Sequence, residues 1–260
     1  MTRLEKTFED LKNAHKKGLI IYIMAGAPDM ETAIEAVKAA EKAGANAIEL
    51  GLPFSDPLAD GPVIQEAGIK SIRNGTSLKS ILELVKEIRT FSAIPLIGMG
   101  YINNVMKYGE ENFVKDFKAA GLDGAIIPDV PHEESDDLRK ICKENDFNFI
   151  EFVTPGTTED RIKEICTSAN GFIYAVSVNG VTGVRDLDYA QIGKVTERVE
   201  KETDVPVAIG FGIGSPKAAE NAAKYADAII VGSAVVRRLL DGKLSEVAPF
   251  IKSLRDAIDK

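Results

Sequence analysis

Eight short apolar runs, each followed by a stretch with helical spacing, are the feature that most constrains the fold of this chain. The runs begin near residues 19, 47, 95, 124, 148, 172, 206 and 228. Their apolar residues are continuous rather than alternating, which is typical of parallel strands that are buried on both faces. Between the runs, apolar residues recur every three or four positions, most clearly over residues 78–88, and this spacing predicts amphipathic helices.

Eight strand–helix units in 260 residues fit a closed (β/α)₈ barrel, whose typical size is about 250 residues. The segments EKAGANAIEL, KAAGLDGAII and AAKYADAIIV resemble one another, and each predicts a helix end, a turn and a strand. We therefore predict a single (β/α)₈ TIM barrel domain over residues 1–260, with an extra N-terminal helix around Leu4, Phe8 and Leu11 covering its bottom. An open doubly wound sheet is the alternative, but similar units without a linker favour closure.

The spacing of the predicted strands indicates two long loops. The start of the second strand, at 47, lies 48 residues before the start of the third, at 95, and 34 residues separate the sixth from the seventh, at 172 and 206. The extra chain therefore follows strands 2 and 6. In a barrel these loops lie at the C-terminal face, where the active sites of such folds are found.

Composition excludes several classes of function. Lys and Arg number 32 against 40 Asp and Glu, and the resulting net charge of −8 argues against nucleic acid as the main partner. No apolar run approaches the roughly 20 residues of a membrane span, and the N-terminal segment lacks the apolar region of a secretory signal. We therefore expect a cytoplasmic protein that binds neither nucleic acid nor membrane.

Cysteine and histidine are scarce. Cys142 and Cys166 form no CxxC pair, which fits a reducing compartment. A zinc site would need nearly all of these cysteines together with His15 and His132, so we expect no metal. Both histidines are predicted to lie at the surface.

Two acidic residues are candidates for proton transfer. Glu49 lies within the apolar run AIELG, and burial of a carboxyl raises its pKa toward neutrality. The alternative is a structural acidic residue at a strand end, with its hydrogen bonds satisfied and no catalytic role. Asp56 and Asp60 follow in PFSDPLADGP, a stiff proline-rich loop. Asp60 could fold back over the same barrel mouth, whereas a turn or helix cap explains Asp56 better.

Small residues follow the last two predicted strands. GFGIGS ends the seventh strand and VGSA ends the eighth, and their backbone N–H groups could face an anion at a helix N-terminus. Because barrels often bind phosphate at this place, the two runs predict a phosphate site. The run SVNGVTGVRD at 177–186 follows the sixth strand and predicts a mobile lid, with a plain long loop as the alternative.

These motifs together resemble the tryptophan synthase α-subunit family. ELGLPFSDPLADGPVIQ at 49–65 is the most specific, and YIMAGAPD, PDVP, GVTG, GFGI and VGSA extend the resemblance over the whole chain in order. The resemblance implies a lyase of tryptophan biosynthesis that cleaves indole-3-glycerol phosphate to indole and glyceraldehyde 3-phosphate, with no cofactor in this subunit. It also implies an α₂β₂ complex, in which a pyridoxal-phosphate β subunit receives the indole through a tunnel.

The resemblance also implies roles for individual residues. Glu49 would shuttle protons, Asp60 would bind the indole N–H, Thr182 would hydrogen-bond Asp60 when the lid closes, and Tyr101 would lie close to Glu49. The indole and glycerol pocket would be lined by Tyr22, Met99, Ile126, Tyr174 and Phe211. The phosphate would be surrounded by Gly183, Gly212, Gly232 and Ser233. The positions facing the β subunit would be Pro53, Asp56, Asn103 and Pro131.

Two other functions remain open at this point. One is another phosphosugar-barrel enzyme, such as an isomerase, against which the run at 49–65 argues. The other is a noncatalytic subunit that activates its partner, against which the presence of both Glu49 and Asp60 argues. Tyr22 is a departure from the family pattern, because phenylalanine is frequent at that position.

Overall fold

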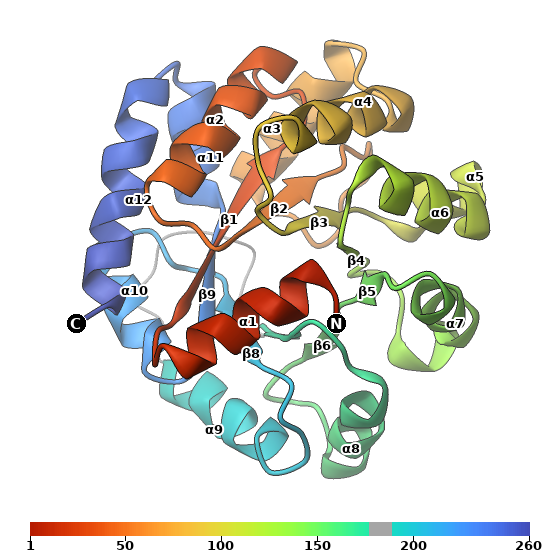
Figure 1. The fold of residues 1–260 in the computed structure, drawn as a ribbon, viewed down its shortest axis with the longest axis vertical. Helices are drawn as coiled ribbons and strands as arrows, with labels where there is room; N and C mark the ends of the chain where they lie inside the picture. The colour runs from red at the N-terminus through yellow and green to blue at the C-terminus, as the bar shows by residue number, and fades with distance from the viewer. Residues whose placement is uncertain (177–188) are drawn as a thin grey trace.

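The computed structural model describes residues 1–176 and 189–260, and these form a barrel of parallel strands enclosed by helices (Figure 1). The strands are β1 (Gly18–Met24), β2 (Ala47–Gly51), β3 (Leu96–Met99), β4 (Gly124–Ile126), β5 (Asn148–Phe149), β6 (Glu151–Val153), β7 (Ile173–Ala175), β8 (Val207–Gly210) and β9 (Ala228–Val231). Every predicted strand start lies within one residue of an observed one. Since Ile150 alone separates β5 from β6, these two are halves of one strand.

That divided strand closes the barrel. The sheet order is β5-β4-β3-β2-β1-β9-β8-β7-β6, so the two ends of the order are the two halves of the same strand. The first half pairs with β4 and the second with β7, both in parallel register. The fold is therefore the predicted (β/α)₈ barrel rather than an open sheet.

Helices cover the outer face of the barrel. They are α2 (Met30–Lys42), α4 (Leu78–Arg89), α5 (Ile102–Tyr108), α6 (Glu110–Ala120), α7 (Asp136–Glu144), α8 (Glu159–Ser168), α9 (Tyr189–Val199), α10 (Pro216–Ala223), α11 (Ser233–Leu240) and α12 (Leu244–Ile258). Successive strand residues pack alternately in two hydrophobic cores, one between the barrel and the outer helices and one inside the barrel. In β1, Leu19 and Ile21 belong to the first and Ile20 to the second. Within the described part of the chain, no helix is long and apolar enough to cross a membrane.

Helix α1 (Arg3–Asn13) covers one end of the barrel, as predicted (Figure 1). A capping box starts it, in which the side chains of Thr2 and Glu5 each accept the other residue's backbone N–H. Its apolar face, Leu4, Phe8 and Leu11, joins the core inside the barrel. Because this end is sealed, a ligand can reach the barrel axis only from the opposite end.

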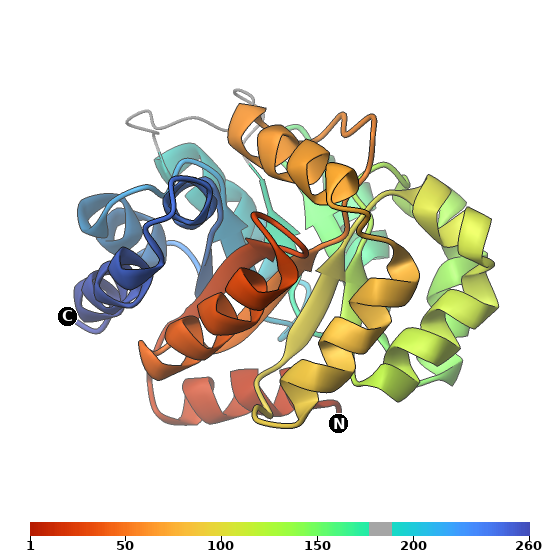
Figure 2. The same ribbon diagram turned by 90° about the horizontal axis from the view of Figure 1, so that it is seen from above.

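The extra chain after β2 consists of residues 52–61 and helix α3 (Pro62–Arg73). Figure 2 shows α3 at the end of the barrel opposite α1. The Ser71 hydroxyl donates a hydrogen bond to the carbonyl of Ala25 at 2.5 Å, which ties α3 to the end of β1. The first predicted long loop is thus confirmed. The second falls at 177–188 and lies outside the described residues.

Shortening a buried side chain of α1 should destabilise the barrel. Leu4 is fully buried, so Leu4→Ala leaves a cavity and should lower the free energy of unfolding by about 3 kcal/mol in a urea titration. Leu58, which is 91% exposed, provides the control, and Leu58→Ala should change stability by less than about 0.5 kcal/mol. Equal effects of the two substitutions would contradict the covering role of α1.

Candidate active site

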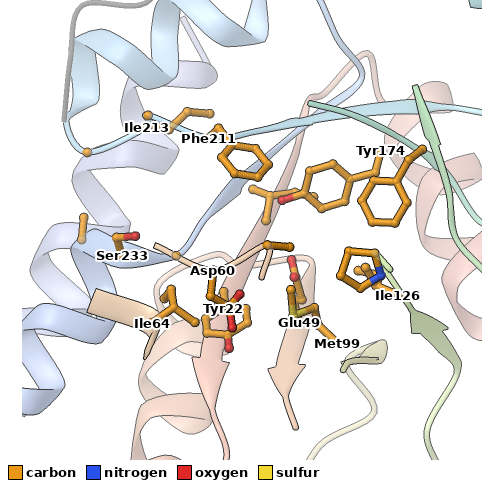
Figure 3. Close-up of a pocket in the computed structure, with 18 residues that line it drawn as sticks. Tyr22, Glu49, Asp60, Ile64, Met99, Ile126, Tyr174, Phe211, Ile213 and Ser233 are labelled. Atoms are coloured by element: carbon orange, nitrogen blue, oxygen red, sulfur yellow. The ribbon is translucent and has the colours of Figure 1, made fainter. Parts of the chain in front are cut away.

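The C-terminal ends of the strands surround one cavity of about 820 Å³, its open mouth included (Figure 3). Its walls are formed by Tyr22, Glu49, Ala59, Asp60, Ile64, Met99, Ile126, Pro128, Phe152, Tyr174, Phe211, Gly212, Ile213, Gly214, Ile230, Gly232, Ser233 and Ala234. Apolar walls with a few converging polar groups are typical of a small-molecule site.

Most of the predicted site residues meet in this cavity. It includes Tyr22, Glu49, Asp60, Met99, Ile126, Tyr174, Phe211, Gly212, Gly232 and Ser233. Tyr101 is not on the wall but contacts the loop that carries Asp60. The predicted lid and its residues Thr182 and Gly183 lie outside the described residues, so their roles stay predictions.

The sequence analysis missed several wall residues. They are Ala59, Ile64, Pro128, Phe152 and Ile230, whereas Ile213, Gly214 and Ala234 belong to the two runs predicted to bind phosphate. Pro128 follows β4 and Phe152 belongs to the strand predicted from 148, so both lie near strand C-termini. That place in a predicted barrel was a usable signal, because residues there face the mouth.

Glu49 points into the barrel from β2, where it pairs in register with Tyr22 of β1. Its side chain is almost completely buried, and within the described part of the chain its Oε2 atom has no hydrogen-bond partner. Burial first, and the nearby charge of Asp60 second, raise the pKa of Glu49 from 4.5 to about 8. Glu49 therefore holds a proton at neutral pH and can deliver it.

Asp60 lies at the end of the loop after β2, and Tyr101 holds that loop in place. The hydroxyl of Tyr101 accepts the backbone N–H of Ala59 at 3.1 Å, and its ring stacks on Phe54 with centroids 5.1 Å apart. Burial raises the pKa of Asp60 to about 6, while a hydrogen bond from Tyr101 opposes this rise. The expected closeness of Tyr101 to Glu49 stays a prediction, and the contacts of the Tyr101 hydroxyl are with Ala59 and Asp60.

Two tyrosines of the wall depend on glycines of the neighbouring strands. A Cβ at Gly51 would lie 2.1 Å from the hydroxyl of Tyr22, and a Cβ at Gly210 would lie 2.1 Å from that of Tyr174. Burial raises the pKa of both tyrosines well above the usual value, so both hydroxyls stay protonated. In Figure 3 the rings of Tyr174 and Phe211 lie on the side of the cavity opposite Glu49 and Asp60.

The part of the cavity near β8 and β9 is suited to an anion. The helices α10 and α11 begin here, preceded by the small residues Gly214 and Gly232. Phe211 has φ = +86° and Gly212 has φ = +70°, so the chain turns sharply after β8. Backbone N–H groups and the positive ends of helix dipoles favour a phosphate at such a place.

Nothing in the described residues resembles a metal centre, since they contain no group of three His, Cys, Asp or Glu side chains that could hold an ion. Both cysteines are buried on helices, Cys142 on α7 and Cys166 on α8. The prediction for His132 was wrong. Its side chain is only 10% exposed, because it packs against the buried carboxylate of Glu151, with Nδ1 3.0 Å from Oε1.

The positions predicted to face a partner lie around the mouth of the barrel. Asp56, Asn103 and Pro131 are exposed, and Pro53 is half-buried. Leu58, 91% exposed, and Met106, 62% exposed, belong to the same segments and were not predicted. Exposed apolar side chains beside exposed polar ones are compatible with a partner surface.

Known proteins resemble this chain over its full length. The family model described as tryptophan synthase alpha chain matches residues 8–255. A curated tryptophan synthase alpha chain from Caldanaerobacter subterraneus subsp. tengcongensis is 42% identical over 263 residues, covering 99% of this chain and 100% of that protein.

Solved structures share the fold. A crystal structure of tryptophan synthase subunit alpha from Legionella pneumophila str. Paris has a TM-score of 0.93 at 33% identity, covering 100% of this chain and 99% of that one. A structure of Mycobacterium tuberculosis tryptophan synthase has a TM-score of 0.91 at 32% identity, covering 99% and 98%.

The raised pKa of Glu49 makes stability depend on pH. Folding raises this pKa from 4.5 to about 8, so the folded chain keeps a proton that the unfolded chain releases. Stability is therefore lost as pH rises through this interval. Glu49→Gln removes this loss. The free energy of unfolding of the variant, relative to that of the unmodified chain, should therefore increase by a few kcal/mol between about pH 5 and about pH 9.

Urea titrations at several pH values measure this difference. Glu83 of α4 provides the control, because its side chain is 65% exposed and pairs with Lys86. Glu83→Gln, a surface substitution, should change the free energy of unfolding by less than about 0.5 kcal/mol at each pH. A flat difference for Glu49→Gln as well would contradict the raised pKa.

Proposed function

The chain belongs to the tryptophan synthase alpha chain family, and on that premise we propose that it cleaves indole-3-glycerol phosphate to indole and glyceraldehyde 3-phosphate. The observation that carries the proposal is the pair Glu49 and Asp60 in one apolar cavity, with pKa values of about 8 and about 6. At neutral pH the first is largely protonated and the second largely ionised. One site thus contains an acid and an anion.

The first proposed step is protonation of the indole ring. Protonated Glu49 transfers its proton to C3, which becomes tetrahedral, and positive charge develops at N1. The carboxylate of Asp60 accepts a hydrogen bond from the N1–H and stabilises that charge. Because the anion is in place before the reaction, little reorganisation is needed.

The second step breaks the carbon–carbon bond. Glu49, now ionised, removes the proton of the hydroxyl on the side-chain carbon attached to C3. That carbon becomes the aldehyde, and the electrons of the broken bond return to the ring and restore neutral indole. The net change is one proton moved from the hydroxyl to C3, so these steps need no metal or organic cofactor in this subunit.

Binding follows the division of the cavity. The phosphate would be held by Gly212, Gly232 and Ser233, together with Gly183 of the segment at 177–188. The indole ring would lie against Met99, Ile126, Tyr174 and Phe211, beside Tyr22. Thr182 would hydrogen-bond Asp60 when that segment closes, which would exclude water and retain the neutral indole.

The proposed setting is a cytoplasmic α₂β₂ complex of amino-acid biosynthesis. One structural relative is the tryptophan synthase of Mycobacterium tuberculosis. A β subunit containing pyridoxal phosphate would receive the indole. Exposed Asp56, Asn103 and Pro131, with Pro53 beside them, would face it. This surface borders the open end of the barrel, which suits direct transfer.

Substitution of either carboxyl tests the proposed reaction. Glu49→Gln can neither give nor take the proton and should lower kcat for indole-3-glycerol phosphate by about 10³-fold or more. Asp60→Asn keeps the shape but loses the charge and should lower kcat by about 10²-fold. Release of glyceraldehyde 3-phosphate is followed for each variant.

Glu83→Gln on α4 is the matched control and should retain full activity. Circular dichroism and inorganic phosphate binding show whether each variant is folded with its anion site intact. Full cleavage by Glu49→Gln, or no cleavage by the folded unmodified chain, would overturn the proposed function.

A further inference from the structure

A buried cluster of charged side chains lies on the outer face of β6, behind the wall of the cavity. Glu151 points outward between Ile150, which belongs to the core inside the barrel, and Phe152, which lines the cavity. Its side chain is 5% exposed, and those of His132 and Arg139 are 10% and 15% exposed. None of the three belongs to the cavity wall.

Arg139 of α7 joins the segment after β4 to β6. Its Nη1 donates a hydrogen bond to the backbone oxygen of His132 at 2.6 Å and lies 3.4 Å from Oε1 of Glu151. The guanidinium also contacts Ser135 and Asp136, and the hydroxyl of Ser168 donates to the same Glu151 oxygen at 3.4 Å.

The histidine ring adds a second connection to Glu151 only in the tautomer that carries the proton on Nδ1. Nδ1 of His132 lies 3.0 Å from Arg139 Nη1 and 3.0 Å from Glu151 Oε1. An arginine nitrogen can only donate and an ionised carboxylate can only accept, so one ring nitrogen satisfies one of these contacts at a time. Nη1 of Arg139 carries two hydrogens, so it can donate to the backbone oxygen of one segment and to the carboxylate of the other when the ring nitrogen does not take one of them.

The two segments that Arg139 joins each supply a residue to the cavity. Pro128 precedes His132 in the segment after β4, and Phe152 directly follows Glu151. Phe152 pairs in register with Tyr174 of β7, and their ring centroids are 5.3 Å apart. A shift of Glu151 would therefore change the wall against which the indole ring is proposed to lie.

We propose that Arg139 and Glu151 form a clamp that positions Phe152 and Pro128 on the cavity wall, and are thus positioning residues for substrate binding. A buried ion pair that loses the charge of either partner leaves the other charge uncompensated, so the strand that carries Glu151 must move or admit water. The kinetic part of this proposal rests on the proposed function, whereas the position of the wall does not.

The sequence contains no tryptophan, so the fluorescence of one introduced tryptophan measures directly how the cavity wall is packed. Phe152→Trp introduces a single indole fluorophore into the wall. In that background Glu151→Gln should shift the emission to longer wavelength and raise acrylamide quenching about twofold, because the side chain loses its fixed packing.

Asp123→Asn in the same background is the matched control. Asp123 is also 5% exposed and is paired with Arg89, whose side chain is 14% exposed, at 2.9 Å. It directly precedes β4, at the end of the barrel remote from the cavity. Its loss should lower stability by an amount similar to the loss of Glu151 and leave the emission unchanged. No shift for Glu151→Gln, or equal shifts for both variants, would overturn the clamp.

The second measurement uses chains with Phe152 restored. Glu151→Gln should raise KM for indole-3-glycerol phosphate about tenfold with kcat changed less than about threefold, because the lost wall contact is made in the ground state and the transition state alike. Asp123→Asn should leave both constants within about twofold. An unchanged KM for Glu151→Gln would contradict the positioning role.

Arg139→Lys covers the case in which Glu151→Gln fails to fold. It keeps the charge but has a single nitrogen in place of Nη1, which contacts both segments, and Nη2, which contacts Asp136, so it should give the same emission shift and rise in KM to a smaller extent. Arg139→Lys with unchanged emission and KM would overturn the proposal. If the unmodified chain shows no cleavage, the proposed function fails, and the emission of the Phe152→Trp variants still tests the clamp.

Discussion

Burial of two carboxyl groups in an apolar barrel mouth is the constraint on which the account of this protein depends. Desolvation penalises a charged carboxylate, so both pKa values rise, and Tyr101 limits the rise for Asp60 alone. The difference gives two carboxyl groups of one cavity different protonation at neutral pH. Among the described residues one Glu49 oxygen has no hydrogen-bond partner, which reduces stability, and the proposed proton transfer to a ligand would account for its position.

The rest of the fold keeps that cavity closed at one end and fixed in shape. The divided strand β5–β6 completes the barrel, and α1 seals the end opposite the cavity. The glycines at 51 and 210 admit the two tyrosines to the wall. On the outside of β6, Arg139 and Glu151 would hold the wall near Phe152, so the scaffold outside the barrel also bears on the site.

Local patterns in the sequence predicted most of this structure, because a parallel strand buried on both faces and a capped helix are defined by neighbouring residues. Glu49 stood out as an acid in an apolar run, and the small residues after the last strands indicated the place of the proposed anion site. Contacts between distant segments could not be predicted. His132 and Glu151 are 19 residues apart and come into contact because the strand formed by β5 and β6 pairs with β4. Tyr101 contacts a loop 42 residues earlier in the chain. The lid residues Thr182 and Gly183 stay predictions.

The central claim is that Glu49 is protonated and Asp60 ionised in the same resting site. Carbon-13 NMR of the chain labelled at its side-chain carboxyl carbons tests it most directly, with Glu49→Gln and Asp60→Asn assigning the two signals. The account predicts midpoints at about pH 8 for Glu49 and about pH 6 for Asp60. Two signals that both titrate near the model-peptide values of about 4 would contradict it.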